Sequence, residues 1–270
     1  MPLIAAIQMT SGPDVSANLQ DARALLEAAA GRGARLAALP ENFAFLGLLD
    51  GDKRSIAEDE GRGPIQEFLA ESARRLNIWI VGGTVPLRGA ADGRVAAASL
   101  VYDSAGKRRA RYDKIHLFDI QLPGRAESYR ESANVAPGSA PVVVETPVGR
   151  LGLSVCYDVR FPELFRRLSA AGAQLLAVPS AFTEPTGRAH WETLLRARAI
   201  ENLCFVVAPA QSGFHPNGRE TYGDSMIVDH WGRVLERLPR GRGCITAEVD
   251  LEGQRRDRDS FPSLTHRVLN

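Results

Sequence analysis

The 270-residue sequence has few cysteines, no long hydrophobic run and almost no net charge. Its three cysteines, Cys156, Cys204 and Cys244, form neither an even-numbered disulfide framework nor a CxxC metal or redox pair. No stretch approaches the roughly 18 apolar residues of a membrane-spanning helix. Lysine and arginine total 33 against 32 acidic residues, whereas proteins of nucleic acids and membrane surfaces usually carry a basic excess. These absences predict a cytoplasmic protein with no nucleic-acid or membrane partner.

Metal and phosphate sites also find little support in the sequence. The five histidines show neither HxH nor HExxH spacing. The Gly-Arg-Gly triplets at 61–63 and 241–243 match neither the GxGxxG nor the GxxxxGK pattern of a phosphate-binding loop. We therefore expect no metal ion and no cofactor.

Short apolar runs alternate with amphipathic segments along the chain. Some predicted strands are joined by hairpin signals, such as 103–106 and 146–149, and others are separated by helices. Both connection types fit an α/β fold with a mixed sheet, or with two sheets covered by helices. No repeat or linker interrupts the series, so we expect one domain over residues 1–270. The expected strands are 3–7, 35–39, 78–81, 95–102, 108–112, 142–145, 151–156, 174–178, 204–208, 226–228, 234–238 and 244–249, and the expected helices are 18–30, 63–76, 161–171 and 189–202.

Two further segments lack such patterns. Residues 120–139 form the longest irregular stretch, and a loop of that length in a compact domain is often functional. Residues 254–258 are charged and are expected to form a solvated end of the chain.

Three segments place a reactive side chain directly after a predicted strand. Glu41 follows strand 35–39, Lys114 follows strand 108–112, and Cys156 closes strand 151–156 just before a helix. A strand-to-helix turn exposes a side chain and directs backbone N–H groups towards it, as in nucleophile elbows. Taken singly, each residue also has an ordinary interpretation: a surface acid, a lysine extended along the surface, and a packed small hydrophobe. Cys204 and Cys244 lie inside apolar strands and are expected in the core.

In combination, these segments resemble a known family. LPENF with Glu41, YDKIHLF with Lys114 and SVCYDVRFPEL with Cys156 resemble the ordered motifs of the nitrilase superfamily of carbon–nitrogen hydrolases. The likeness continues through AGAQLLAVPSAFTEPTGRAHWETLLRARAIEN and TYGDSMIVDHWGRV. It implies a four-layer α-β-β-α sandwich, usually assembled through helices into a homodimer or a larger homo-oligomer. It also implies that Glu41, Lys114 and Cys156 form a catalytic triad.

The resemblance further implies a second glutamate after the lysine. Glu131 fits this position best because the Glu-Ser pair matches, and Glu127 in the same loop is the alternative. In the implied mechanism Lys114 favours the thiolate of Cys156, and Glu41 accepts the thiol proton and later activates water. The oxyanion is stabilised by Lys114 and a backbone N–H near Tyr157, and a thioester forms. The second glutamate, Glu131, holds Lys114 in place.

Within the superfamily, AHWETLLRARAIEN and AQSGFHPNGRETYGDSMIVDHWG most resemble the deaminated glutathione amidases. The ω-amidases are the near alternative, followed by hydrolases of N-carbamoyl or β-ureido acids and by a catalytically silent binding domain. The first two groups act on small carboxylated amides, so a cationic contact is expected.

Arg160 is the candidate for that cationic contact, because a guanidinium binds a carboxylate through two hydrogen bonds. The alternative for Arg160 is an ion pair with Asp158 or Glu163. Phe182 and Thr183 are expected to line the substrate pocket.

Overall fold

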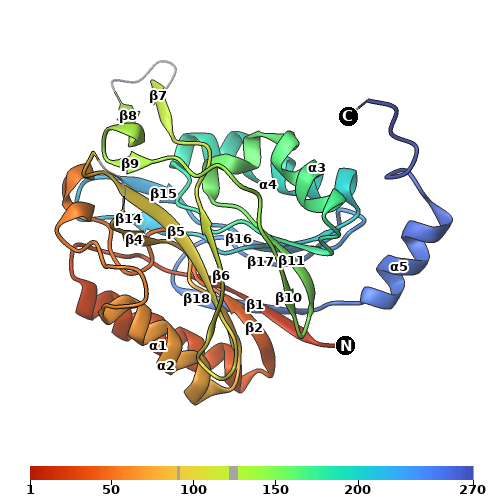
Figure 1. Cartoon of the computed structure of the whole chain (residues 1–270), viewed down its shortest axis with the longest axis horizontal. Coiled ribbons are helices and arrows are strands. Elements are labelled where there is room, and N and C mark those ends of the chain that lie inside the picture. Colours follow the sequence, from red (N-terminus) through yellow and green to blue (C-terminus); the bar gives the residue numbers. More distant parts are fainter. Residues whose placement is uncertain (90–91, 122–126, 270) are drawn as a thin grey trace.

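Two large β-sheets lie face to face, with helices on their outer sides (Figure 1). The protein is described here by a computed structural model that covers residues 1–89, 92–121 and 127–269. Helices α1 and α2 cover one sheet and helices α3 and α4 cover the other, whereas α5 lies beside the sandwich. The layer order is thus α-β-β-α, as expected.

The first sheet has the strand order β18-β1-β2-β3-β5-β4, with β6 and β9 also paired to β5. The second has the order β10-β11-β12-β13-β16-β17. The strands of the first sheet are β1 (Leu3–Gln8), β2 (Ala34–Ala38), β3 (Trp79–Val81), β4 (Val85–Leu87), β5 (Val95–Tyr102), β6 (Arg108–Asp113), β9 (Val135–Ala136) and β18 (Gly243–Glu248). Those of the second are β10 (Val143–Thr146), β11 (Gly149–Leu153), β12 (Leu175–Ala177), β13 (Phe205–Ala208), β16 (Ser225–Val228) and β17 (Val234–Leu238).

The remaining elements are helices and two small ribbons. The ribbons pair β7 with β8 and β14 with β15. The helices are α1 (Val15–Gly31), α2 (Pro64–Leu76), α3 (Pro162–Ala170), α4 (Glu184–Asn202) and α5 (Leu251–Ser260), the short 3₁₀ helices are η1 (Asp50–Arg54), η2 (Glu131–Ala133) and η3 (Cys156–Arg160), and the ribbon strands are β7 (Asp119–Gln121), β8 (Ser128–Arg130), β14 (Ser212–Phe214) and β15 (Glu220–Tyr222).

Strand β1 shows why the central strands read as continuous apolar runs. Ile4 and Ala6 belong to the core that includes both sheets, whereas Ala5 and Ile7 belong to the core beneath α1 and α2. Successive side chains of a strand point to opposite faces, so a strand buried on both faces needs apolar residues at every position. The first sheet therefore separates the two larger cores of the sandwich.

Two expectations about helices are wrong. Helix α4 begins at Glu184 rather than at residue 189, because Pro185 occupies its first turn, where the missing N–H costs nothing. The charged segment 254–258 lies within helix α5 instead of forming a solvated end. Gln254 in that segment is fully buried and donates hydrogen bonds to the carbonyl oxygens of Gln174 and Leu203.

Strand β11 is also shorter than predicted. It ends at Leu153, and Cys156 opens η3 instead of closing the strand. Part of the irregular segment 120–139 forms β8, η2 and β9, while residues 122–126 lie outside the described residues. Across the parts of the chain that are described, no helix has the length and apolar content needed to cross a membrane.

Candidate active site

Strands from both sheets deliver the three residues of the expected triad to one end of the sandwich. Glu41 follows β2 and Lys114 follows β6, both in the first sheet, while Cys156 follows β11 in the second. All three side chains line one small cavity, together with Phe118, Tyr157, Ala181, Phe182, Thr183 and Thr186. Residues that lie far apart in the sequence thus meet at a single site.

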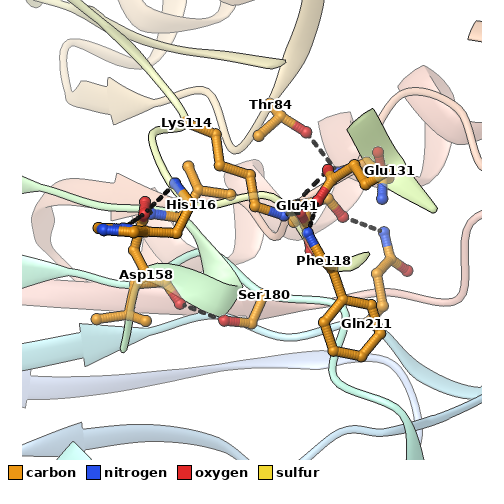
Figure 2. A network of polar contacts seen from close by, with 12 residues as sticks. Glu41, Thr84, Lys114, His116, Phe118, Glu131, Asp158, Ser180 and Gln211 are labelled. Atoms are coloured by element: carbon orange, nitrogen blue, oxygen red, sulfur yellow. Dashed lines mark hydrogen bonds and ion pairs between the residues drawn. The ribbon is translucent and has the colours of Figure 1, made fainter. Parts of the chain in front are cut away.

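Lys114 is held between two carboxylates (Figure 2). Its Nζ lies 2.8 Å from Oε1 of Glu41 and 2.8 and 3.0 Å from the two carboxylate oxygens of Glu131. Lys114 is 1% exposed and Glu41 is 5% exposed. Burial alone would lower the pKa of Lys114, but the charges of Glu131 and Glu41 raise this pKa well above its ordinary value. Lys114 therefore stays an ammonium.

Glu131, and not Glu127, contacts Lys114. The Phe118 N–H donates to Oε2 of Glu131 at 2.8 Å and fixes the orientation of the carboxylate. Burial would raise the pKa of Glu131, but the charge of Lys114 lowers it below its ordinary value. Glu127 instead accepts a hydrogen bond from the Tyr129 hydroxyl at 3.0 Å.

The backbone around Glu41 is fixed by two polar side chains that sequence reasoning missed. Gln211 donates to the carbonyl oxygen of Glu41, and the Thr84 hydroxyl accepts from the N–H of Asn42 (Figure 2). Gly83 allows this close approach, because a Cβ at that position would lie 2.0 Å from the carbonyl oxygen of Pro40. No spacing in the sequence connects these residues to Glu41.

Cys156 lies on a sharp turn between β11 and η3. Its φ is +50°, a left-handed conformation that is rare for residues with a side chain. Its N–H donates to the Pro179 carbonyl at 2.9 Å. The N–H of Tyr157 belongs to the first turn of η3, where backbone donors lack acceptors within the helix. The turn can therefore offer this N–H beside the sulfur atom.

The carboxylate of Asp158 holds this turn in place through hydrogen bonds. Oδ2 accepts hydrogen bonds from the Val155 N–H at 2.8 Å and the Tyr112 hydroxyl at 2.7 Å. Oδ1 lies 3.0 Å from the N–H and 2.7 Å from Nδ1 of His116 (Figure 2). The His116 ring stacks on Phe161, with 3.7 Å between ring centroids. The sequence predicts Asp158 only as an alternative partner of Arg160, since nothing in the spacing indicates Tyr112 or His116.

Opposing effects act on the thiol of Cys156, whose pKa lies above its ordinary value. Burial raises the pKa of Cys156 most, and the negative charge of Glu41 raises it further. The ammonium of Lys114 lowers this pKa, as expected, but the effects of burial and of Glu41 are larger. Attack by this sulfur therefore requires a base, and the carboxylate of Glu41 lines the same cavity.

Two of the three expected substrate contacts line the cavity. Phe182 and Thr183 are both buried there, and the Thr183 hydroxyl hydrogen-bonds the Thr186 hydroxyl at 2.8 Å. Arg160 is not among the described residues that line the cavity. Its guanidinium lies 5.2 Å from the ring centroid of Phe182 and contacts Nδ1 of His190.

Arg160 makes neither of the ion pairs given as alternatives. Asp158 is bonded to Tyr112, His116 and the Val155 N–H. Among the described residues, Arg160 contacts His190 and the rings of Tyr157 and Phe182 instead of Glu163. Burial lowers the pKa of Arg160 from its ordinary value. In the described ranges, no three His, Cys, Asp or Glu side chains are grouped so that they could hold a metal ion.

Comparison with known proteins shows which family this chain is similar to. Residues 3–259 match the family model described as carbon-nitrogen hydrolase. The chain is 45% identical to the deaminated glutathione amidase of Synechocystis, over 99% of this chain and 98% of that protein. It is 40% identical to the human protein of that name, over 99% of this chain and 82% of the human one.

Solved structures give the same result. Saccharomyces cerevisiae Nit3, a member of branch 10 of the nitrilase superfamily, superposes with a TM-score of 0.89 at 30% identity, covering 99% of this chain and 97% of Nit3. The Caenorhabditis elegans NitFhit protein gives a TM-score of 0.92 at 43% identity, over 99% of this chain and 65% of that longer chain. With this fold and this match along almost its whole length, the chain belongs to the carbon–nitrogen hydrolase family of the nitrilase superfamily.

Proposed function

We propose that the protein is a cysteine-dependent amidohydrolase that cleaves a small carboxylated amide through a thioester, with deaminated glutathione as its substrate. The observation that carries this proposal is the buried ammonium of Lys114, which lies between Glu41 and Glu131 in the cavity of Cys156. The naming of relatives at 40–45% identity supports the choice of substrate.

Acylation begins with the protonated thiol. Glu41 accepts the proton while Sγ of Cys156 attacks the carbonyl carbon of the amide. The negative charge that develops on the carbonyl oxygen is stabilised by the Lys114 ammonium and the Tyr157 N–H. Glu41 then gives its proton to the amide nitrogen, the C–N bond breaks, and the amine leaves behind a thioester.

Deacylation uses the same carboxylate a second time. Glu41 accepts a proton from water while the water oxygen attacks the thioester carbonyl, and the same two donors stabilise the oxyanion. The C–S bond breaks, the sulfur recovers the proton from Glu41, and the acid product leaves. Glu131 acts as a positioning residue, because it holds Lys114 from the side opposite Glu41.

The substrate carboxylate is assigned to Arg160, with Phe182 and Thr183 along the acyl chain. Arg160 has no carboxylate partner among the described residues, and a guanidinium held over two aromatic rings is oriented to accept one. Because Arg160 lies over the ring of Phe182, the acyl group would extend past Phe182 to reach it.

The test is release of amine product from deaminated glutathione, measured together with the intact mass of the protein. We expect turnover by the wild-type protein, and a mass increase equal to the acyl group when the reaction is quenched early. Cys156→Ala should abolish both signals, whereas Cys204→Ala, which removes a core thiol, should retain them. Product release by Cys156→Ala would overturn the proposal.

The alternatives predict different results in the same assay. An ω-amidase would give a higher kcat/KM for α-ketoglutaramate than for deaminated glutathione, and a carbamoyl amidohydrolase would prefer N-carbamoyl amino acids. A catalytically silent binding domain would give no acyl-enzyme with any of these compounds.

A further inference from the structure

The peptide group between Glu41 and Asn42 is held at both of its polar ends by buried side chains (Figure 2). Its carbonyl oxygen accepts a hydrogen bond from Nε2 of Gln211 at 3.1 Å, and its N–H donates to the hydroxyl of Thr84 at 2.8 Å. Gln211 follows β13 of the second sheet, whereas Thr84 lies between β3 and β4 of the first. Both sheets therefore fix the peptide group next to Glu41.

The side-chain amide of Gln211 can take only one orientation. It is fully buried, and its Oε1 accepts a hydrogen bond from the N–H of Ser11 at 3.0 Å. One hydrogen of Nε2 goes to the Glu41 carbonyl and the other to the Ser11 hydroxyl, at 2.8 Å. A flipped amide would place its NH₂ group against the Ser11 N–H and its oxygen against the Glu41 carbonyl. The contact with Glu41 is therefore enforced by the surroundings of Gln211.

Ser11 extends the same contacts along the loop of Glu41. Its hydroxyl accepts from Gln211 and donates to the carbonyl oxygen of Phe43 at 2.8 Å. Between these points Asn42 has a φ of +57°, a left-handed conformation that few residues other than glycine adopt. The side-chain contacts stabilise this conformation and leave the backbone from Glu41 to Phe43 little freedom to move.

The same network reaches the opposite wall of the cavity. Nδ1 of His215 lies 2.8 Å from the carbonyl oxygen of Ser11, so this nitrogen carries a proton and donates. Burial lowers the pKa of His215 below its ordinary value, and the neutral ring accepts from the Thr221 hydroxyl through Nε2, at 2.7 Å. Thr221 forms a β-bridge with Thr183, which lines the cavity. The backbone of Glu41 and a wall of the acyl pocket thus belong to one set of contacts.

The position of Glu41 matters at every proton transfer of the proposed reaction. One oxygen of its carboxylate lies 2.8 Å from Nζ of Lys114, so a shift of the backbone would strain or break this bond. The carboxylate accepts a proton first from the thiol of Cys156 and later from water, and each donor must lie within hydrogen-bond reach. A misplacement of about 1 Å can lower a rate by about 10²-fold.

We infer that Gln211 is a positioning residue for Glu41, whose buried amide sets the place from which the carboxylate takes up and returns protons. Gln211 is not among the described residues that line the cavity of Cys156, so it acts through the backbone of Glu41. The inference rests on the proposed function and extends it from the reacting residues to a side chain of the second sheet.

The experiment compares two buried glutamines. Gln211→Met removes the amide that holds Glu41 and keeps the length of the side chain, while Gln254→Met removes a buried amide of α5 that donates to two carbonyl oxygens. Both variants should lose stability in urea denaturation. With deaminated glutathione, kcat of Gln211→Met should fall at least about 10-fold and KM should stay within about threefold of wild type, because Glu41 acts in both half-reactions. Gln254→Met should keep the wild-type kcat.

Thr84→Val tests the other end of the same peptide group. It removes the acceptor of the Asn42 N–H and should also lower kcat with little change in KM. A folded Gln211→Met protein that keeps the kcat of Gln254→Met would show that Gln211 only stabilises the fold, and the inference would be overturned. If Gln211→Met does not fold, a wild-type kcat in Thr84→Val overturns it instead.

Failure of the proposed function gives a different result, since the wild-type protein would then not hydrolyse deaminated glutathione. The hold on the Glu41 backbone remains measurable by hydrogen exchange of segment 41–46. Exchange in this segment should be at least about fivefold faster in Gln211→Met and Thr84→Val than in wild type, because a lost buried hydrogen bond makes local opening easier. Gln254→Met should exchange there as the wild-type protein does. Unchanged exchange in the first two variants would overturn the inference independently of catalysis.

Discussion

Lys114 shows how one residue can serve both stability and chemistry. A buried ammonium is costly unless charged partners compensate its loss of hydration, and Glu41 and Glu131 do so at 2.8 Å. The same ammonium lowers the pKa of Glu131 below its ordinary value. The ammonium also points into the cavity of Cys156, where an oxyanion would form.

Replacing Lys114 by methionine should therefore impair both properties. The loss of one oxyanion donor should lower kcat by at least about 10²-fold, and the two unpaired carboxylates should cost about 3–5 kcal/mol of the free energy of unfolding. Steady-state kinetics and urea denaturation measure the two effects. Lys107→Met is the control at an exposed lysine, and a Lys114→Met protein as stable as this control would contradict the account.

At the scale of elements, the turn after β11 determines where the sulfur lies. Cys156 adopts its left-handed conformation because the turn is held at Asp158, whose two oxygens bind Val155, Tyr112 and His116. Tyr112 belongs to β6 and His116 to the segment that follows it, near Lys114. Asp158 thus connects the turn after β11, which carries Cys156, to β6 of the other sheet, which Lys114 follows.

Asp158→Asn should loosen this connection. Both oxygens of Asp158 accept hydrogen bonds, whereas asparagine has an NH₂ group in place of one of them. This NH₂ group would face a donor, so at least one buried hydrogen bond is lost, at a cost of about 1–3 kcal/mol. We expect lower stability and a fall in kcat larger than the change in KM, because the turn that presents Cys156 moves. Tyr112→Phe, which removes one hydroxyl from the same carboxylate, is the milder control. A change in KM alone would contradict a positioning role.

The elements themselves could be predicted where the apolar pattern is strong. Strands β1, β5 and β16 and helix α2 lie within a residue or two of the expected ranges. The pattern failed at α5, whose charged sequence hides the burial of Gln254. It failed there because Gln254 is buried through hydrogen bonds to the carbonyls of distant residues, which no local periodicity reveals.

At the scale of the whole molecule, the packing of the two sheets brings the site residues together. Leu36 of β2 is fully buried in the core shared by both sheets, a few residues before Glu41. Leu36→Ala should lower the free energy of unfolding by about 2–5 kcal/mol because it leaves a cavity. Denaturation measures this, with the exposed Leu49→Ala as control. A loss no larger than that of the control would show that the sheets do not depend on this contact.

The ion pairs of Lys114 also make stability depend on pH. The pKa of Glu131 is lowered in the folded protein, so its contribution is present above its ordinary value of 4.5 and is lost as the pH falls below it. The pKa of Lys114 is raised above 10.5, so its contribution is present throughout the neutral range. Glu131→Gln should therefore be less stable than wild type at pH 7, and this difference should shrink on acidification towards pH 3.

Urea denaturation across this pH range measures the difference. Glu127→Gln is the matched control, because Glu127 lies in the same segment but contacts Tyr129 instead of Lys114. A Glu131→Gln protein whose deficit stays constant between pH 7 and pH 3 would contradict the assigned ion pair.

The sequence by itself determined the long apolar strands and the family, and it singled out Glu41, Lys114 and Cys156, because these depend on local patterns and on ordered motifs. Only the tertiary structure decided that burial raises the pKa of the Cys156 thiol, that Glu131 rather than Glu127 contacts Lys114, and that Asp158 anchors the turn of Cys156. Each of these properties depends on distances between groups from separate strands and sheets. Burial and Coulomb interactions act through space, so their balance exists only once the two sheets have packed.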